Sequence, residues 1–174
     1  FLSVGGTEEI YGIHTESLVN TGDMDGDGFD ELLLGSIHGE WILEGGQVYL
    51  LEGPIDSDLK ARRDAIAIIR SDHRGMGVGW TQQGSDLDGD GLSDLILGTP
   101  FYPDALASWA VDGPGRVSIF KGPIEGFLEI EEADTHLQGE TSTGDDNEIR
   151  FGYDLESTAD FNGDGYLDLL IAAP

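Results

Sequence analysis

Three short apolar runs recur along the chain, and each directly follows a polar segment rich in aspartate and glycine. The runs are residues 32–34, 95–97 and 169–171. Each run is too short for a helix and is bounded by Gly or Pro, which is typical of a strand buried on both faces. We therefore expect three buried strands, each entered from an acidic turn.

Two further segments alternate, contain β-branched or aromatic residues, and are followed by a Gly-Pro pair. They are residues 47–51 (QVYLL), before Gly53-Pro54, and residues 116–121 (RVSIFK), before Gly122-Pro123. These segments predict third strands that end in turns. Residues 65–70 (AIAIIR) predict an outer fourth strand, although the preceding residues 59–64 (LKARRD) could equally form a helical turn.

Self-similarity organises the whole chain, because three segments match in register. They are residues 23–37 (DMDGDGFDELLLGSI), 86–100 (DLDGDGLSDLILGTP) and 160–174 (DFNGDGYLDLLIAAP). Their first aspartates are 63 and 74 residues apart, somewhat more than the ~40 to 50 residues of the commonest propeller repeats. We expect one partial domain, 1–174, with repeats at 1–70, 71–140 and 141–174, the last of them incomplete.

Oxygen-bearing side chains recur within each acidic segment, at positions one, three, five and nine counted from its first aspartate. They are Asp23, Asp25, Asp27 and Glu31; Asp86, Asp88, Asp90 and Asp94; and Asp160, Asn162, Asp164 and Asp168. Calcium takes roughly six to eight oxygens at about 2.3 to 2.6 Å, and alternate residues of a tightly curled loop can point inward to meet it. Position seven is predicted to offer its carbonyl, from Phe29, Leu92 and Tyr166. A glycine at position six allows the sharp turn, and the pattern predicts three calcium sites.

Other metals and motifs fit this pattern less well. An EF-hand requires a bidentate Glu at position twelve between two helices, but Leu34, Leu97 or Ile171 occupies that position here, inside a predicted strand. Magnesium demands near-octahedral geometry, and zinc prefers nitrogen and sulfur. A single loop could be an Asp-Gly turn without an ion, but three copies in one register favour binding. Because loop oxygens fill such a site, we expect a structural ion and no catalysis by it.

Composition narrows the classes of partner. The chain has 174 residues, of which 8 are basic and 35 acidic, giving a formal charge of −27. This field repels nucleic acid and anionic membrane surfaces, so we expect neither as a partner. There are no cysteines, hence no disulfide or thiolate metal site, and no run approaches the ~18 apolar residues of a membrane span. Weak calcium sites suit millimolar calcium, which predicts an extracellular protein, secreted or at the cell surface.

A search for catalytic groups finds no constellation. The histidines His14, His38, His73 and His136 stand at unrelated offsets in their repeats, and no G-x-S-x-G elbow surrounds Ser36. Paired acids for glycoside hydrolysis remain an alternative in so acidic a chain. Packing is favoured over carbohydrate stacking for Trp41, Trp80 and Trp109. The acidic runs at residues 129–134 and 145–148 are expected to be solvated loops.

An apolar or aromatic residue followed by glycine precedes each acidic loop, at Tyr11-Gly12, Val78-Gly79 and Phe151-Gly152, where we expect the first strand of each unit to begin. With the strand ending Ala172-Ala173-Pro174, this order resembles the FG-GAP repeat of integrin α-subunit propellers. The first repeat departs most from the pattern. The resemblance implies an all-β fold of four-stranded antiparallel blades, about two and a half here, belonging to a propeller that closes with seven. It also implies calcium loops on one rim and ligand contacts on the opposite face.

These observations favour an extracellular calcium-binding β-propeller module that acts in adhesion, in protein–protein interaction or as a scaffold. The alternative is a carbohydrate-binding or polysaccharide-processing enzyme domain built on the same repeat. The expected ligand is a protein or a carbohydrate. Because residues 169–172 would expose an apolar strand edge, we expect further blades from the same polypeptide or another chain to cover it.

Overall fold

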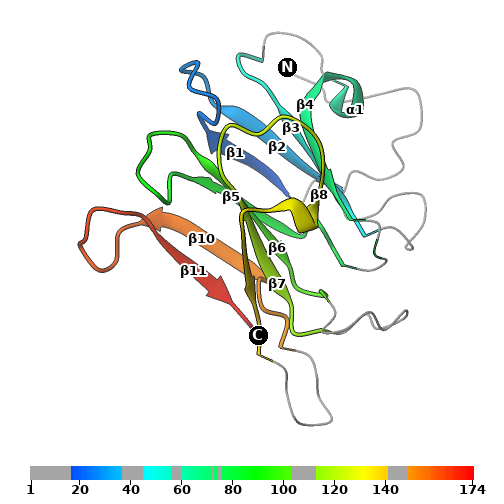
Figure 1. Cartoon of the computed structure of the whole chain (residues 1–174), viewed down its shortest axis with the longest axis vertical. Helices are drawn as coiled ribbons and strands as arrows, with labels where there is room; N and C mark the ends of the chain where they lie inside the picture. Colours follow the sequence, from blue (N-terminus) through cyan, green and yellow to red (C-terminus); the bar gives the residue numbers. More distant parts are fainter. Residues whose placement is uncertain are drawn as a thin grey trace.

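Three β-sheets stand side by side in the computed structural model of the chain (Figure 1). The structure describes residues 17–36, 45–55, 60–71, 73, 76–102, 113–140 and 149–174. Within these ranges almost all regular structure is strand, with one short helix, α1 (Ala61–Asp64), and one 3₁₀ turn, η1 (Ile130–Glu132). No helix of this described part is long and apolar enough to cross a membrane.

The first sheet is an antiparallel meander of four strands to which a fifth strand is added in parallel. Its order is β1 (Leu18–Gly22), β2 (Glu31–Ser36), β3 (Gln47–Leu51), β4 (Ala65–Arg70) and β8 (Gly126–Glu129). The predicted third and fourth strands are confirmed as β3 and β4. Helix α1 directly precedes β4, so the segment holds both the helical turn and the strand that its pattern allowed.

The second and third sheets repeat the same plan to different extents. The second contains β5 (Thr81–Ser85), β6 (Asp94–Thr99), β7 (Arg116–Phe120) and β9 (Thr135–Gln138). The third contains only β10 (Asp154–Ala159) and β11 (Asp168–Ala172). The three apolar runs lie in β2, β6 and β11, as predicted, and in the described residues β11 pairs with β10 alone.

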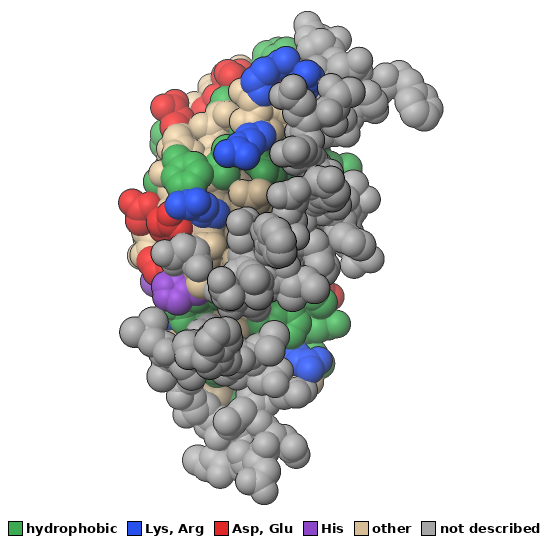
Figure 2. Space-filling model, turned by 90° about the vertical axis from the view of Figure 1, so that its right-hand side faces the viewer, with side chains coloured by type: hydrophobic (Ala, Val, Ile, Leu, Met, Phe, Trp, Pro, Cys, Tyr) green, Lys and Arg blue, Asp and Glu red, His purple; other side chains and the backbone are tan. Residues whose placement is uncertain are grey.

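The expectation that residues 129–134 form a solvated loop is wrong. Glu129 ends β8, which pairs in parallel with β4, and residues 130–132 form η1. Two causes are visible: Ile130 is fully buried, and the Glu129 N–H donates to the Glu132 carboxylate at 2.7 Å in a capping box. Arg70 of β4 holds β8 by an ion pair with Glu129 at 3.0 Å and by stacking 4.5 Å over the Phe127 ring. Figure 2 shows basic side chains beside acidic and hydrophobic ones on this side of the molecule.

Apolar side chains fill the spaces between the sheets, so neighbouring positions of the buried strands point into different cores. The core between the first two sheets contains Met24, Leu33, Val48, Leu50, Ile69, Val78, Leu95, Leu97 and Phe120. The core between the second and third sheets contains Ile96, Val117 and Leu155. Because β6 contributes to both cores, all six of its residues are buried, which explains its continuous apolar sequence.

The glycines of the two described pairs, Val78-Gly79 and Phe151-Gly152, allow one sheet to approach the next. A Cβ at Gly79 would lie 3.0 Å from the Gly35 Cα atom in the first sheet, and one at Gly152 would lie 2.8 Å from the Arg116 carbonyl oxygen. The residues before these glycines form parallel bridges to the preceding sheet. Strands β5 and β10 begin two residues after these glycines and not at the pairs themselves, where the sequence predicted them to begin. The Tyr11-Gly12 pair lies outside the described residues.

Candidate metal sites in the acidic loops

The three acidic loops join the first two strands of each sheet and lie in a row along one side of the molecule (Figure 1). Each loop is folded by hydrogen bonds from its own backbone to its own carboxylates. At position one, Asp23 accepts from the Gly26 N–H at 2.6 Å and from the Gly28 N–H at 3.0 Å. The second loop repeats these bonds at 2.7 and 3.0 Å, and the third at 2.6 and 2.9 Å. The glycine predicted at the sharp turn has a φ of 90° in Gly28, and the other two loops are alike.

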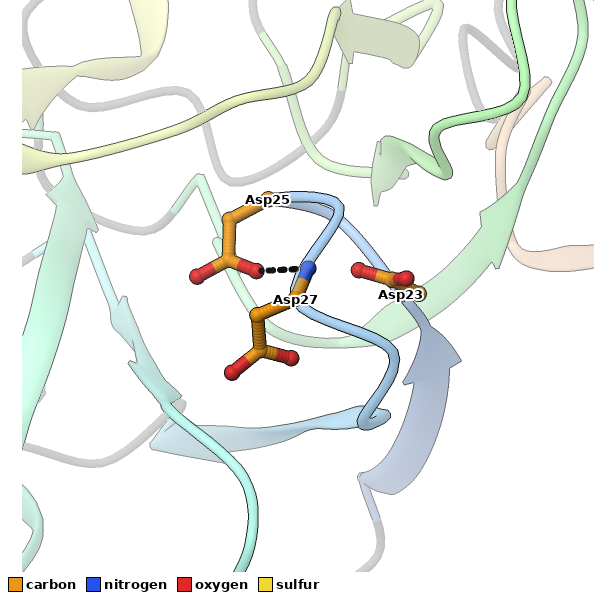
Figure 3. Close-up of side chains that lie close together, drawn as sticks. All are labelled: Asp23, Asp25 and Asp27. Atoms are coloured by element: carbon orange, nitrogen blue, oxygen red, sulfur yellow. Dashed lines mark hydrogen bonds between the residues drawn. The ribbon is translucent and has the colours of Figure 1, made fainter.

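The side chains at positions three and five also accept hydrogen bonds from the loop backbone, and their carboxylate oxygens lie close to that of position one. The Asp25 carboxylate accepts from the Asp27 N–H at 3.0 Å (Figure 3), and the Asp27 carboxylate accepts from the Phe29 N–H at 2.8 Å. In the first loop, Asp23, Asp25 and Asp27 each offer an oxygen, and these atoms lie within 4.8 Å of one another. Asp86, Asp88 and Asp90 do the same in the second loop. Three oxygens at this separation can contact one hard cation of calcium's size.

Position nine supplies a buried carboxylate beneath the first two loops. Glu31 is 1% exposed and Asp94 is 2% exposed, and each accepts the N–H of position two, from Met24 at 2.6 Å and from Leu87 at 3.1 Å. Burial raises the pKa of both carboxyls, and the neighbouring loop aspartates add to that rise, although backbone N–H groups oppose it. Oε1 of Glu31 is buried without a hydrogen-bond partner among the described residues. A buried anionic oxygen beside further carboxylates fits a bound cation, because unpaired buried charge is costly.

The third loop has the same backbone geometry but a different set of donors. Asn162 stands at position three, and its amide donates to Asp164 at 3.0 Å and to Asp168 at 3.2 Å, which ties the loop acids together. Asp168 at position nine is partly exposed, unlike its two counterparts. The pKa of Asp160 is lowered, chiefly by the hydrogen bond from the Gly165 N–H. At the predicted ligand positions this loop has one carboxylate fewer than the others, so its electrostatic attraction for a cation is weaker.

The side chains at position seven link successive loops, a contact that was not predicted from the sequence. A Cβ at Gly26 would lie 3.3 Å from Leu92, and one at Gly89 would lie 2.8 Å from the Tyr166 ring. The Ser93 N–H also donates to the Asp23 carbonyl at 2.8 Å, from the second loop to the first. The recurrence of an apolar or aromatic residue at position seven was the available signal. The loops therefore form a contiguous row.

An aromatic cluster lies near the end of the sheets opposite the loops. The Trp80 ring packs 5.1 Å from Phe101 in an edge contact and 5.4 Å from Tyr153. The Arg116 guanidinium lies 3.4 Å over the Tyr102 ring. Trp80 therefore packs against other aromatic side chains, as predicted. Trp41 and Trp109 lie outside the described residues.

The two described histidines both lie beside Glu131, since the Nε2 atom of His136 is 3.4 Å from the Glu131 carbonyl oxygen. The Nδ1 atom of His136 lies 3.1 Å from the Ser118 hydroxyl, and that of His73 lies 4.0 Å from the Glu131 carboxylate. Ser36 is the buried last residue of β2. His14, His38 and the acidic run at residues 145–148 lie outside the described residues.

Comparison with known proteins agrees with this architecture. A family model described as FG-GAP repeat matches residues 79–120 and 151–174. Integrin alpha-PS2 of Drosophila melanogaster is 33% identical over 159 residues, covering 88% of this chain and 10% of that protein. Integrin alpha pat-2 of Caenorhabditis briggsae is 30% identical over 160 residues, covering 88% of this chain and 12% of that protein. The chain is an FG-GAP repeat protein of the integrin α-like type.

The three sheets are accordingly blades of a β-propeller, as predicted: two with four strands of their own and one represented by two strands. The FG-GAP chain spans about a tenth of the length of the integrins it matches. A more distant relative, the phosphatidylinositol-glycan-specific phospholipase D of Mus musculus, is 27% identical over 139 residues, 76% of this chain and 15% of that protein. The integrin relatives support the prediction that the chain is not itself an enzyme.

Proposed function

We propose that the chain is an extracellular calcium-binding propeller module that acts in adhesion or protein–protein interaction. One observation carries the calcium assignment. In the first two loops, three aspartates place oxygens within 4.8 Å of one another above a buried position-nine carboxylate, and Glu31 Oε1 in the first loop is buried without a partner. Such a group of like charges is unfavourable unless a cation neutralises it.

Each loop would hold its ion with the side chains at positions one, three, five and nine and with the position-seven carbonyl. The residues are Asp23, Asp25, Asp27, Phe29 and Glu31; Asp86, Asp88, Asp90, Leu92 and Asp94; and Asp160, Asn162, Asp164, Tyr166 and Asp168. When bound, calcium supplies positive charge that stabilises the loop. Position nine begins β2, β6 or β11, so the ion would also fasten the loop to its strand.

The adhesion role rests on the relationship to integrin α-chains and on the position of the aromatic cluster. Trp80, Phe101 and Tyr153 lie away from the loops, and Tyr153 is 37% exposed. Partly exposed aromatic side chains are enriched where proteins bind one another. We propose that this end faces a protein partner and that further blades, supplied by the same polypeptide or another chain, complete a seven-bladed ring. The repeats would then correspond to residues 1–70, 71–140 and 141–174.

A carbohydrate-binding or polysaccharide-processing enzyme domain is the second candidate, and the phospholipase D relative is an enzyme that contains a segment similar to this chain. In that case the propeller would be an appended module and the chemistry would belong to another domain. Binding to immobilised polysaccharides, measured beside binding to integrin-type protein ligands, separates the two roles. A saturable interaction with polysaccharide alone would favour the second candidate.

Calcium binding is tested by metal content and by thermal stability. We expect excess chelator to lower the melting temperature relative to millimolar calcium, because an ion that binds only the folded state stabilises it. Asp90→Ala should remove one calcium equivalent in elemental analysis, whereas Glu125→Ala, an exposed acid outside the loops, should remove none. Superimposable melting curves with and without calcium, or unchanged calcium content in Asp90→Ala, would contradict the assignment.

A further inference from the structure

One residue beside the first two loops differs in charge between blades that are otherwise alike. In the first blade Leu32 of β2 pairs with Leu51 of β3, and the next residue is Glu52, followed by Gly53-Pro54. In the second blade Leu95 of β6 pairs with Phe120 of β7, and the next residue is Lys121, followed by Gly122-Pro123. Leu32 and Leu95 are both position ten of their loops. Glu52 and Lys121 therefore occupy equivalent places in the fold.

Gly53 and Gly122, which follow Glu52 and Lys121, lie beside the candidate metal sites. The backbone N–H of Gly53 lowers the pKa of Glu31, and that of Gly122 lowers the pKa of Asp94, against the larger effect of burial. A Cβ at Gly53 would lie 2.6 Å from the Asp30 carbonyl oxygen, and one at Gly122 would lie 2.9 Å from the Ser93 carbonyl oxygen. Both carbonyls belong to position eight of a loop. The residue before each glycine is thus held beside its own loop. Gly122 also adjoins the first loop, because a Cβ there would lie 2.8 Å from the Met24 carbonyl oxygen.

From this position the Lys121 side chain pairs with the Asp88 carboxylate of the second loop. Its ammonium group donates to Asp88 Oδ2 at 2.6 Å, while Asp88 Oδ1 accepts the Asp90 N–H at 3.2 Å. The Lys121 backbone N–H is fixed by Asp134 at 2.9 Å, which positions the stem of the side chain. Asp88 stands at position three and belongs to the group of three aspartates that gather their oxygens. The second loop is therefore paired with a positively charged side chain, Lys121, whereas the first loop has an acid, Glu52, at the equivalent position of the chain.

We propose that the residue before Gly-Pro sets the relative calcium affinity of its loop, with Lys121 weakening the second site and Glu52 strengthening the first. This inference rests on the proposed calcium-binding function. Lys121 weakens binding in two ways: the ion must compete with the ammonium for Asp88, and a positive charge stays near the site. Lys121 and Asp88 have half and a third of their side chains exposed, so water screens the effect to about three- to tenfold in affinity.

A calcium titration of the chain, followed by the amide signals of three glycines in ¹⁵N spectra, reads each loop separately. The probes are the position-six glycines Gly28, Gly91 and Gly165, whose N–H groups bind the first aspartate of their loop. We expect Gly28 to respond at lower calcium than Gly91. Lys121→Gln should lower the midpoint at Gly91 by about three- to tenfold and shift that at Gly28 by less, because Lys121 pairs with an aspartate of the second loop. Lys121→Arg, which keeps the charge, is the matched control and should leave both midpoints in place.

The reciprocal variant Glu52→Lys should raise the midpoint at Gly28 and not at Gly91, and it provides a second route if Lys121→Gln fails to fold. An unchanged Gly91 midpoint in Lys121→Gln, or equal shifts at both glycines, would overturn the inference while leaving calcium binding intact. No response of any of the three glycines at millimolar calcium would refute the proposed function, and this inference with it.

Discussion

The second and third blades carry nearly the same strand sequence and bury it to very different extents. Ile96 in the middle of β6 is fully buried, whereas Leu170 at the equivalent position of β11 is 51% exposed. The loops differ in the same direction, since Leu87 at position two of the second loop is partly buried and Phe161 at position two of the third is 61% exposed. β6 has a sheet on each side, while β11 has one on a single side among the described residues.

The difference shows that the repeat specifies a strand with two apolar faces but not the neighbours that cover them. Ile96 packs with Val117 and Leu155 in the core toward the third blade, and Leu95 and Leu97 pack toward the first. Burial of an apolar side chain is worth roughly 1.5 to 3 kcal/mol relative to leaving it exposed. An FG-GAP blade therefore obtains much of its stability from the adjacent blades.

Truncation of the equivalent side chains Ile96 and Leu170 tests whether the adjacent blades stabilise each strand. Ile96→Ala should lower the free energy of unfolding by about 2 to 5 kcal/mol, because it leaves a cavity between two sheets. Leu170→Ala should cost less than about 1 kcal/mol, because half of the side chain already contacts solvent. Urea unfolding followed by circular dichroism measures both. Equal losses in the two variants would mean that β11 is covered in solution.

The strands that the sequence predicted are those whose pattern is local. The apolar runs, the alternating β3 and β7 segments and the AIAIIR strand depend on side-chain periodicity, and all appear in the structure. Strand β8 was missed because its pairing is nonlocal: Ala67 lies opposite Gly126 in sequence-distant segments. The acidic residues that follow it suggested a solvated loop, whereas the parallel pairing with β4 shows the strand, which the burial of Ile130 and the contact of Arg70 with Phe127 support.

The sequence predicted a set of candidate donors for each loop, but it did not predict which side chains lie beside those donors. Three copies of the alternating aspartates in one register predict a cation in each loop, and the backbone bonds to Asp23, Asp86 and Asp160 repeat from loop to loop as a curled turn requires. The pairing of Lys121 with Asp88, across 33 residues of sequence, depends on how β7 lies beside the loop. So does the contact between Tyr166 and Gly89. Local spacing carries no information about either.

Contacts between loops provide a second, smaller test of the same comparison. Tyr166 of the third loop lies against Gly89 of the second, whereas Phe29 belongs to the first loop in the row. Tyr166→Ala should lower the free energy of local opening in the second loop by roughly 0.5 to 1 kcal/mol. Phe29→Ala should leave the second loop unchanged. Amide hydrogen exchange at Gly89 and Gly91 measures both, and equal protection in Tyr166→Ala and the parent would show that the loops open independently.

The smallest expected effect is a pH dependence that reverses sign with calcium. The pKa of Glu31 and that of Asp94 are raised by burial, so on acidification the folded state takes up these protons before the unfolded state does. In calcium-free buffer, stability should therefore rise as the pH falls from 7 toward about 5, above the ordinary carboxyl values. The lowered pKa of Asp160 acts in the opposite direction, but only below its ordinary value of 3.8.

In saturating calcium the same acidification should lower stability, because protons then compete with the ion for the buried carboxylates. Urea unfolding at pH 7, 6 and 5, with and without calcium, measures the two slopes. Glu31→Gln, which cannot ionise, is the control and should flatten the calcium-free slope without abolishing it, since Asp94 keeps its raised pKa. Parallel slopes in the two buffers would show that the buried carboxylates of the first two blades do not hold the ion.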